Sequence, residues 1–587
     1  MTWDLSKLYA SFDAPEFLND IEELKKTAEA AVMQARGMDK VSVPALEEAI
    51  RLNEKAATLA TKTMSFAQLT LAADANCEPA MAAYARLLPV MNRLEEATSA
   101  MSAQLGAVED LDGLIGESDL LKAHAFLLRR LQQNAKHVID PALEPTVLRM
   151  QMTGGNAWEQ LRDQLDGNHM VDITVDGETK SLPLSAVRGM ANSPDADVRK
   201  AAYEAELAAY PKMEIPMAAC LNGIKGEART LAELKHYDSV LDMALDGANM
   251  DRETLDALLE AMEESLPMFR RYFRLKARML GYDGGLRFYD LFAPVGRAKG
   301  DYTPEDARQI LVRELGAFSP RMADMINRAF DERWIDMFPR EGKGGGAFCS
   351  GMHPLGISYV LANFEGSYGS VSTLAHELGH AYHNECMKDL PILMADYPMP
   401  LAETASIFNE TLLAQRILEN ADKDTRVALL EQQLSDAAQV IVDIMSRFLF
   451  EKEVVERRAN TTLSPRELCE IMLDAQKKTY GDGLDPECMH PYMWACKSHY
   501  YSTDVHFYNF PYAFGQLFAV GVYALYQQKG AAFLPDYEKL LRAAGSGMVR
   551  DVAASVGIDV ADVNFWRSSL KVFEEKLEEL EALAGKC

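Results

Sequence analysis

The sequence has little positive charge: 60 lysines and arginines face 88 aspartates and glutamates, which gives a net charge of −28 at pH 7. Nucleic acids and anionic membrane surfaces would repel such a chain, so neither is an expected partner. The same sign disfavours a protein that captures acidic substrates. Solubility explains the excess of acids without any special function.

Long apolar runs are also missing, and no leader segment is expected. Residues 1–7 show no basic head followed by an apolar stretch, and the apolar stretch 517–525 is far too short to span a membrane. The eight cysteines are scattered, with no Cys-x-x-Cys pair. Such cysteines are expected to be free thiols in a reducing cytosol. We therefore expect a cytoplasmic protein, whose oligomeric state the sequence leaves undetermined.

What the chain contains in abundance is amphipathic helix. Alanine, leucine, methionine and glutamate recur with helical spacing in several long runs, which predict a mainly α fold. The expected helices cover residues 16–36, 43–62, 78–104, 251–280, 303–317 and 320–332. The methionines, 30 in all, are expected to fill gaps in the core.

A change of period near residue 171 suggests a domain boundary. Residues 171–175 alternate between apolar and polar, Asp176-Gly177 is typical of a hairpin turn, and 178–184 return. The hairpin and the break that follows it predict a helical N-terminal domain over 1–195 and a second domain over 196–587.

The segment 343–351 is rich in glycine and lacks the spacing of phosphate-binding or dinucleotide-binding loops. It precedes 356–364, which has the composition of a strand, so one or two short strands are expected directly before residue 372. Two roles stay open for the glycines: a flexible turn, or a hinge and edge strand that pairs with an extended peptide.

The strongest motif is His-Glu-x-x-His, formed by His376, Glu377 and His380. On a helix, residues i and i+4 share a face, so the two histidines can bind a single metal ion. The carboxylate of Glu377 follows directly and can reach a water molecule on that ion. A catalytic zinc site nevertheless needs a third protein ligand.

The third ligand must come from another element. His383 shares the face of His376 but lies about 10 Å along the helix axis, so a shared ion is improbable. The next expected helix, which opens at Pro400, carries two acids, Glu403 and Glu410, seven residues apart among apolar neighbours. Such acids are costly to bury unless they are paired or bound to metal. We expect Glu403 to bind the metal and Glu410 to orient a ligand; two solvent-facing acids are the alternative.

These motifs resemble the oligoendopeptidase F branch of the thimet oligopeptidase family of zinc peptidases. Further similarity lies in short segments elsewhere in the chain: Trp3-Asp4-Leu5, 289–291, 334–336 and 343–349. The resemblance implies a large helical body with a deep substrate channel and one zinc ion on the channel wall. It also implies that His376, His380 and Glu403 bind the zinc and that Glu377 is the general base, with 196–587 as the catalytic domain.

A second group of histidines and tyrosines lies downstream, over 493–515. Phenol and imidazole groups can stabilise the oxyanion of peptide hydrolysis, although aromatic residues so close together also occur in ordinary cores. The family resemblance implies catalytic roles for His499, Tyr508 and Tyr512. His506 is a rival to His499 because it stands directly before Phe507-Tyr508.

The expected activity is zinc-dependent hydrolysis of internal bonds in short peptides, with oligopeptides as the only expected partners. One alternative is a zinc carboxypeptidase or dipeptidyl carboxypeptidase with the same metal site. Another is a peptide-binding scaffold without activity, which would have no need for Glu377. Imidazole and carboxylate ligands also accept manganese or cobalt, so the sequence does not fix the metal.

Overall fold

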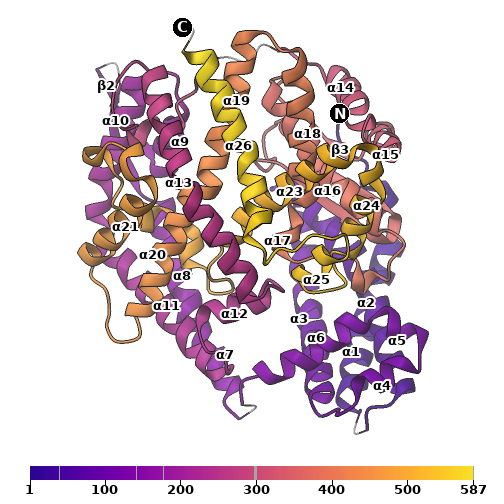
Figure 1. The fold of residues 1–587 in the computed structure, drawn as a ribbon. Helices are drawn as coiled ribbons and strands as arrows, with labels where there is room; N and C mark the ends of the chain where they lie inside the picture. Colours follow the sequence, from indigo (N-terminus) through magenta and orange to yellow (C-terminus); the bar gives the residue numbers. More distant parts are fainter. Residues whose placement is uncertain (39, 141, 176, 297–299, 586–587) are drawn as a thin grey trace. The chain divides into compact units, whose positions relative to one another are not determined.

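The computed structural model describes residues 1–38, 40–140, 142–175, 177–296 and 300–585, and helices dominate these ranges (Figure 1). The predicted mainly α fold is therefore confirmed. Strands in the same ranges are short and belong to one hairpin and one three-stranded sheet. No helix of the described residues has both the length and the apolar character needed to cross a bilayer.

The chain folds into two compact units, each assembled from three segments. The first unit comprises Met1–Val138, Lys299–Arg416 and Leu525–Val556, and the second comprises Ile139–Ala298, Ile417–Ala524 and Gly557–Cys587. The boundary expected after residue 195 falls inside the second unit. The division into domains 1–195 and 196–587 stays a prediction.

Three long helices open the first unit: α1 (Pro15–Arg36), α2 (Val43–Ala73) and α3 (Glu78–Gly106), and they pack against one another. α2 continues well beyond the expected end at residue 62. Its apolar stripe continues through the buried residues Phe66, Ala67 and Leu69, which keep the helix packed against its neighbours.

The other helices that lie wholly or mostly in this unit are shorter than these three. They are α4 (Leu111–Gly116), α5 (Asp119–Ala123), α6 (Ala125–Asn134), α14 (Pro304–Gly316), α15 (Pro320–Asp331), α16 (Tyr368–Met387), α17 (Met399–Ala402), α18 (Thr404–Asn420), α24 (Leu534–Ala543) and α25 (Val549–Ala554).

The first unit also holds a small sheet of β3 (Ile335–Asp336), β4 (Phe348–Met352) and β5 (Ile357–Leu361), in the order β3-β5-β4. β5 pairs parallel with β3 and antiparallel with β4. All five residues of β5 are buried, as expected for a central strand, whereas β4 lies at the edge and is mostly half-buried. α16 packs on β4 and β5, so the expected strands do lie beside the His-Glu-x-x-His helix.

The N-terminal residues hold the back of this sheet. The amide of Asp4 donates to the carbonyl of Arg333 at 2.8 Å, and the hydroxyl of Tyr359 on β5 donates to the carbonyl of Asp4 at 2.8 Å. The Trp3 ring packs edge-on against Tyr359 with centroids 6.0 Å apart. These contacts hold β5 in place, and β5 is one of the two strands on which α16 packs.

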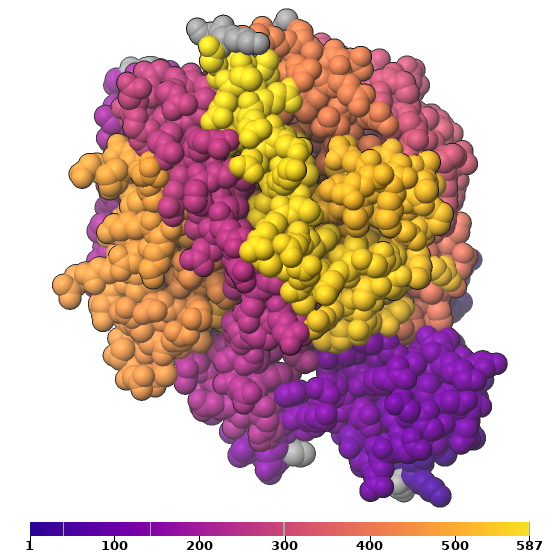
Figure 2. All heavy atoms as spheres, in the orientation of Figure 1, coloured from indigo at the N-terminus to yellow at the C-terminus, as the bar shows by residue number. Residues whose placement is uncertain are grey.

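The second unit contains the predicted hairpin, formed by β1 (Met170–Val175) and β2 (Glu178–Pro183) in antiparallel register. Its helices are α7 (Glu144–Thr153), α8 (Gly155–Gly167), α9 (Leu184–Gly189), α10 (Ala196–Ala209), α11 (Glu214–Leu234), α12 (Val240–Gly247), α13 (Arg252–Met279), α19 (Lys423–Ala438), α20 (Ile444–Arg457), α21 (Pro465–Tyr480), α22 (Met493–Cys496), α23 (Phe510–Lys529) and α26 (Val563–Ala584). α26 lies along α13 and α19, as the yellow helix in Figures 1 and 2 shows. A buried cluster joins the hairpin to α10, α11, α20 and α21.

Candidate metal centre

The helix α16 positions the two histidines and Glu377. Ser367 caps its first turn by accepting a hydrogen bond from the Ser370 amide at 3.1 Å. The buried side chains of Val371, Leu374 and Leu378 hold the helix in the first unit. His376 and His380 project from one face, one turn apart, as the spacing predicts.

Glu403 reaches the histidines from a turn. It lies between the end of α17 at Ala402 and the start of α18 at Thr404, so the sequence expectation of one continuous helix from residue 400 is wrong. Gly379 on α16 allows this helix to approach α18 closely. A Cβ atom on Gly379 would stand 2.5 Å from the Cα atom of Ser406 and 2.6 Å from the carbonyl oxygen of Ala405.

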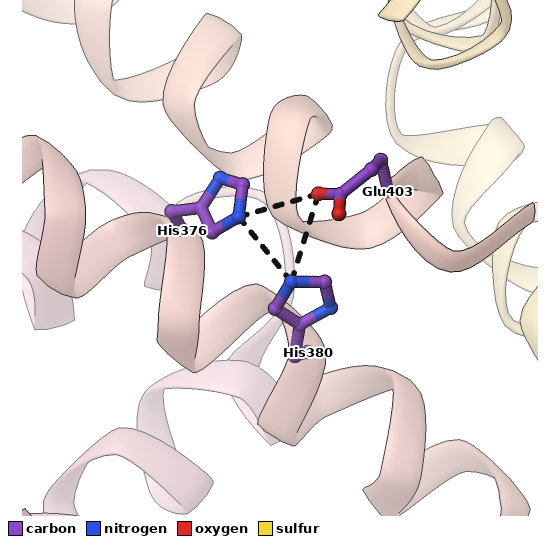
Figure 3. A group of neighbouring side chains, drawn as sticks. All are labelled: His376, His380 and Glu403. Carbon is purple, nitrogen blue, oxygen red and sulfur yellow. Dashed lines mark hydrogen bonds and ion pairs between the residues drawn. The ribbon is translucent and has the colours of Figure 1, made fainter. Parts of the chain in front are cut away.

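The three predicted metal ligands meet in one cluster, and their donor atoms all lie within 4.8 Å of one another (Figure 3). The Nε2 atoms of His376 and His380 are 3.3 Å apart. One carboxylate oxygen of Glu403 lies 3.2 Å from Nε2 of His376 and 3.6 Å from Nε2 of His380. Glu377 is 5% exposed and follows His376 directly on the helix.

Two further side chains of α18 hold this cluster in place. A carboxylate oxygen of Glu410 contacts Nδ1 of His376, on the side of the ring opposite the cluster. The hydroxyl of Ser406 donates to Oε2 of Glu403 at 2.7 Å. Glu410 was expected in this supporting position; the hydroxyl of Ser406 was missed, because serine at this spacing carries no distinctive signal.

The carboxylates of Glu403 and Glu410 stabilise positive charge at the cluster. Burial by itself would lower the pKa of His376, but its hydrogen bonds to Glu403 and Glu410 raise it to about 10. Burial would raise the pKa of Glu403, yet the same pairing lowers it to about 2. Burial lowers the pKa of His380 to about 4, so this ring keeps a free lone pair near pH 7. Burial raises the pKa of Glu377 to about 7.

This donor set fits a divalent metal ion. Two imidazole nitrogens and one carboxylate oxygen are the usual protein ligands of a catalytic zinc ion, which keeps a further position for water. A cation at the cluster would supply the positive charge that Glu403 and Glu410 favour. The contact of Glu410 with Nδ1 of His376 orients the ring so that Nε2 faces the cluster, where an ion would replace the proton between Nε2 and Glu403.

His383 takes no part in the cluster, as its position along the helix predicts. Its Nε2 atom donates to the carbonyl of Leu541 at 3.0 Å, and its ring stacks on Tyr397 with centroids 4.0 Å apart. Cys349 on β4 is a neighbour that the sequence did not single out. Burial and, second, the charge of Glu377 raise the pKa of the Cys349 thiol, in keeping with the packing of α16 on β4.

The predicted aromatic residues form a group of their own in the second unit. The ring of His499 lies face to face with Tyr508 at 5.5 Å and edge-on to Tyr512 at 6.1 Å, and the two tyrosines are 5.2 Å apart. Burial lowers the pKa of His499, which keeps the ring neutral near pH 7. Its Nδ1 atom is buried without a hydrogen-bond partner among the described residues.

His506, the rival histidine, has different neighbours. Its Nδ1 atom lies 3.4 Å from Nζ of Lys225, and burial followed by the charge of Lys225 lowers its pKa well below the usual range. His506 is buried against Lys225, whereas the ring contacts with Tyr508 and Tyr512 described above are made by His499. The geometry thus groups His499, rather than His506, with the two tyrosines.

The turn that carries Tyr508 is held by a buried ion pair. Lys225 of α11 and Glu451 of α20 lie 2.6 Å apart, with side chains 1% and 2% exposed. The same carboxylate accepts the amide of Phe507 at 3.0 Å and the side-chain amide of Asn509 at 2.9 Å. Phe507 has a φ of 52°, a left-handed conformation that a bulky residue adopts only when its surroundings impose it.

A mainly helical fold with two histidines, a neighbouring glutamate and a second glutamate as third ligand from the turn before α18 is typical of metal-dependent peptidases. The comparison of sequences identifies the family. The model of peptidase family M3 matches residues 189–572. The chain belongs to this family and is a metal-dependent peptidase.

Relatives confirm the resemblance to oligoendopeptidase F. Oligopeptidase PepF of Bacillus subtilis is 25% identical over 505 residues, which cover 84% of this chain and 74% of that protein. The chromosomal oligoendopeptidase F of Lactococcus lactis subsp. cremoris is 29% identical over 414 residues, covering 70% of this chain and 68% of that protein. A crystal structure of oligoendopeptidase-F from Enterococcus faecium has a TM-score of 0.71 at 20% identity, over 97% of this chain and 99% of that chain, which shows a shared fold.

Proposed function

We propose that this protein is a zinc endopeptidase that hydrolyses internal bonds of short peptides. The cluster of His376, His380 and Glu403, with Glu377 directly beside it on α16, is the observation that carries the proposal. The names of the relatives, oligopeptidase and oligoendopeptidase, support internal cleavage of oligopeptides over trimming of a terminus. An intact Glu377 argues against a silent scaffold.

His376, His380 and Glu403 would hold one zinc ion, and Glu410 and Ser406 would orient His376 and Glu403. When bound, zinc would polarise the scissile carbonyl and lower the pKa of a water molecule. Zinc is preferred over manganese and cobalt because two imidazoles, one carboxylate and an open position are the usual ligands of catalytic zinc.

Glu377 is the proposed general base. Its carboxylate stands one residue from a ligand and is nearly excluded from bulk water, which favours proton exchange with a group at the metal. It accepts the proton of the attacking water and then passes it to the leaving amine. A pKa raised towards neutrality suits a group that must both accept and release a proton near pH 7.

The substrate backbone has a natural partner in β4. In the described part of the chain this strand pairs only with β5, so its outer edge can bind an extended peptide through the main chain. Main-chain pairing makes few demands on side chains and supports a broad choice of sequences. The proposed roles of His499, Tyr508 and Tyr512 as hydrogen-bond donors to the oxyanion stay predictions, as do a cytoplasmic location and the absence of nucleic-acid or membrane partners.

One digestion experiment tests this function. The zinc-loaded enzyme is incubated with peptides of graded length and with an unfolded protein, with and without a chelator, and the products are identified by mass spectrometry. We expect internal cuts in the short peptides, little cleavage of the protein, and loss of activity with the chelator that added zinc restores. Successive trimming from the C-terminus would overturn the proposal in favour of a carboxypeptidase.

A further inference from the structure

The second unit contains a cavity of about 90 Å³ lined by its own residues. That volume holds roughly six to nine water-sized groups, the size of a small metabolite and too small for a peptide. Aromatic rings of Tyr203, Phe288 and Tyr289 line part of the wall. Phe292 also lines the cavity and is 42% exposed, so the cavity reaches the protein surface.

One wall is formed by a π-helical turn, Gln439–Asp443, between α19 and α20. Both Gln439 and Asp443 face the cavity. A π-helical turn is less stable than a regular one and occurs frequently at functional sites.

Lys497 is the charge on the wall without a partner. It lines the cavity, and its ammonium group forms no hydrogen bond or ion pair with any described residue. Other charged groups of the wall are paired: Arg199 with Asp290 at 2.8 Å, Arg188 with Glu206 at 3.3 Å, and Asp443 with Arg447. Burial lowers the pKa of Lys497, against the attraction of Asp443, so an anionic group in the cavity would stabilise the ammonium.

His490 supplies a second unused group. It is 1% exposed and lines the cavity, and Nδ1 has no hydrogen-bond partner among the described residues. Nε2 lies 3.3 Å from a carboxylate oxygen of Glu206 without hydrogen-bond geometry, and a ring proton on Nε2 would face this acid. With the proton on Nε2, Nδ1 is a buried acceptor without a donor among the described residues, and a donor on the ligand would satisfy it.

We propose that this cavity binds a small α-amino acid, with its carboxylate on Lys497 and its amino group on His490. The aromatic rings, together with Val187 and Leu291, form the pocket for the apolar side chain. An α-hydroxy acid offers the same carboxylate with a different donor, and the test separates the two. The site does not depend on the proposed peptidase mechanism.

The test uses isothermal titration calorimetry on the full-length, zinc-loaded enzyme. Three probes of one shape are compared: L-valine, L-valinamide, which lacks the carboxylate, and 3-methylbutanoate, which lacks the amino group. L-2-hydroxy-3-methylbutanoate is the fourth probe. We expect L-valine to bind, and the amide and the plain acid to bind roughly tenfold more weakly or worse, because each loses a charge-assisted hydrogen bond.

Variants show where the ligand sits. Lys497→Met removes the ammonium and should weaken L-valine binding at least about tenfold, whereas Lys477→Met, on the exposed side of α21, should leave it unchanged. Ala191→Met narrows the cavity without touching Lys497 and should weaken binding as well. If L-valine bound to the zinc ion and not in the cavity, all three variants would bind it with the same affinity.

Several outcomes overturn the proposal: no binding of L-valine, equal binding of L-valine and L-valinamide, or full binding by both Lys497→Met and Ala191→Met. If 3-methylbutanoate bound as tightly as L-valine, the proposed contact between the amino group and His490 would be rejected. Tighter binding of the hydroxy acid than of L-valine would reject an amino acid as the ligand. Peptide hydrolysis measured on the same samples tests the peptidase separately.

Discussion

Glu377 combines burial with a position next to the metal ligand His376. Replacement by glutamine keeps the shape and the hydrogen-bonding capacity but removes the proton acceptor. We expect Glu377→Gln to retain zinc and to lose peptide hydrolysis by roughly 10²- to 10⁴-fold or more. Zinc is measured by elemental analysis, and turnover with a fluorogenic peptide.

The matched control is Glu365→Gln, an exposed acid a few residues before the same helix, which should hydrolyse peptides at the normal rate. A Glu377→Gln enzyme with full zinc and near-normal turnover would remove Glu377 as the base. Loss of zinc in this variant would instead show that its carboxylate helps to bind the ion.

Glu403 and Glu410 both contact His376, but on opposite sides of the ring. Glu403 faces the cluster, so Glu403→Ala removes a ligand and should yield an enzyme with little bound zinc. Glu410→Ala only releases the far side of the ring and should weaken zinc binding by about 10- to 100-fold. Chelator competition measures both, and a stronger loss in Glu410→Ala would reverse the two roles.

At the scale of secondary-structure elements, the close approach of α16 and α18 at Gly379 supports the metal centre. A methyl group there would meet the backbone at Ser406 and Ala405, which cannot rotate away as a side chain could. Gly379→Ala should force the helices apart, destabilise the fold by about 1–3 kcal/mol and reduce zinc affinity. Gly369→Ala on the same helix meets only the Ser367 hydroxyl at 3.6 Å and should be neutral.

Thermal unfolding and zinc titration of both glycine variants check this prediction. If Gly379→Ala bound zinc as tightly as Gly369→Ala does, the distance between the two helices would not control the metal centre. The comparison is informative because both substitutions add the same methyl group to one helix.

The buried pair of Lys225 and Glu451 sets the turn that carries Tyr508. Glu451→Met leaves a buried ammonium without its partner and removes two acceptors from the turn, at a cost of about 3–5 kcal/mol. The double variant Lys225→Met/Glu451→Met removes both charges and should recover part of this loss. Glu453→Gln, exposed on the same helix, is the control.

Urea unfolding measures the stability of these variants, and peptide hydrolysis reports on the turn. Equal stability of the single and the double variant would show that the unpaired charge is not what destabilises the protein. If the double variant regains stability without regaining turnover, Glu451 acts on Tyr508 through the turn it holds. That outcome would support a role for the tyrosines.

Sequence reasoning was most reliable where one element carries the whole signal. The spacing of His376 and His380 and the exclusion of His383 follow from helix geometry alone, and the mainly α fold follows from amphipathic periodicity. The break at Glu403 was missed because an Ala- and Leu-rich segment reads as continuous helix. Close approaches of distant residues, such as Gly379 to Ser406 or Glu451 to Phe507, leave no local pattern.

At the scale of the whole molecule, the interleaving of distant chain segments limits what can be predicted from the sequence. Each unit takes three separate stretches of chain, a grouping that no single change of period along the sequence indicates. The cavity around Lys497 illustrates the same limit. Its wall combines residues from near 190, 290, 440 and 490, which no motif connects.

The net charge of −28 acts over the whole molecule and should steer substrates. Two peptides of equal length and identical central sequence are compared, one with lysines and one with glutamates at both ends. At low ionic strength we expect a roughly tenfold higher kcat/KM for the cationic peptide, because the field of the protein attracts it. At about 0.5 M salt, where screening reduces the reach of charges to a few ångströms, the ratio should approach one. A ratio that does not change with salt would locate the preference in direct contacts at the site and not in the field of the molecule.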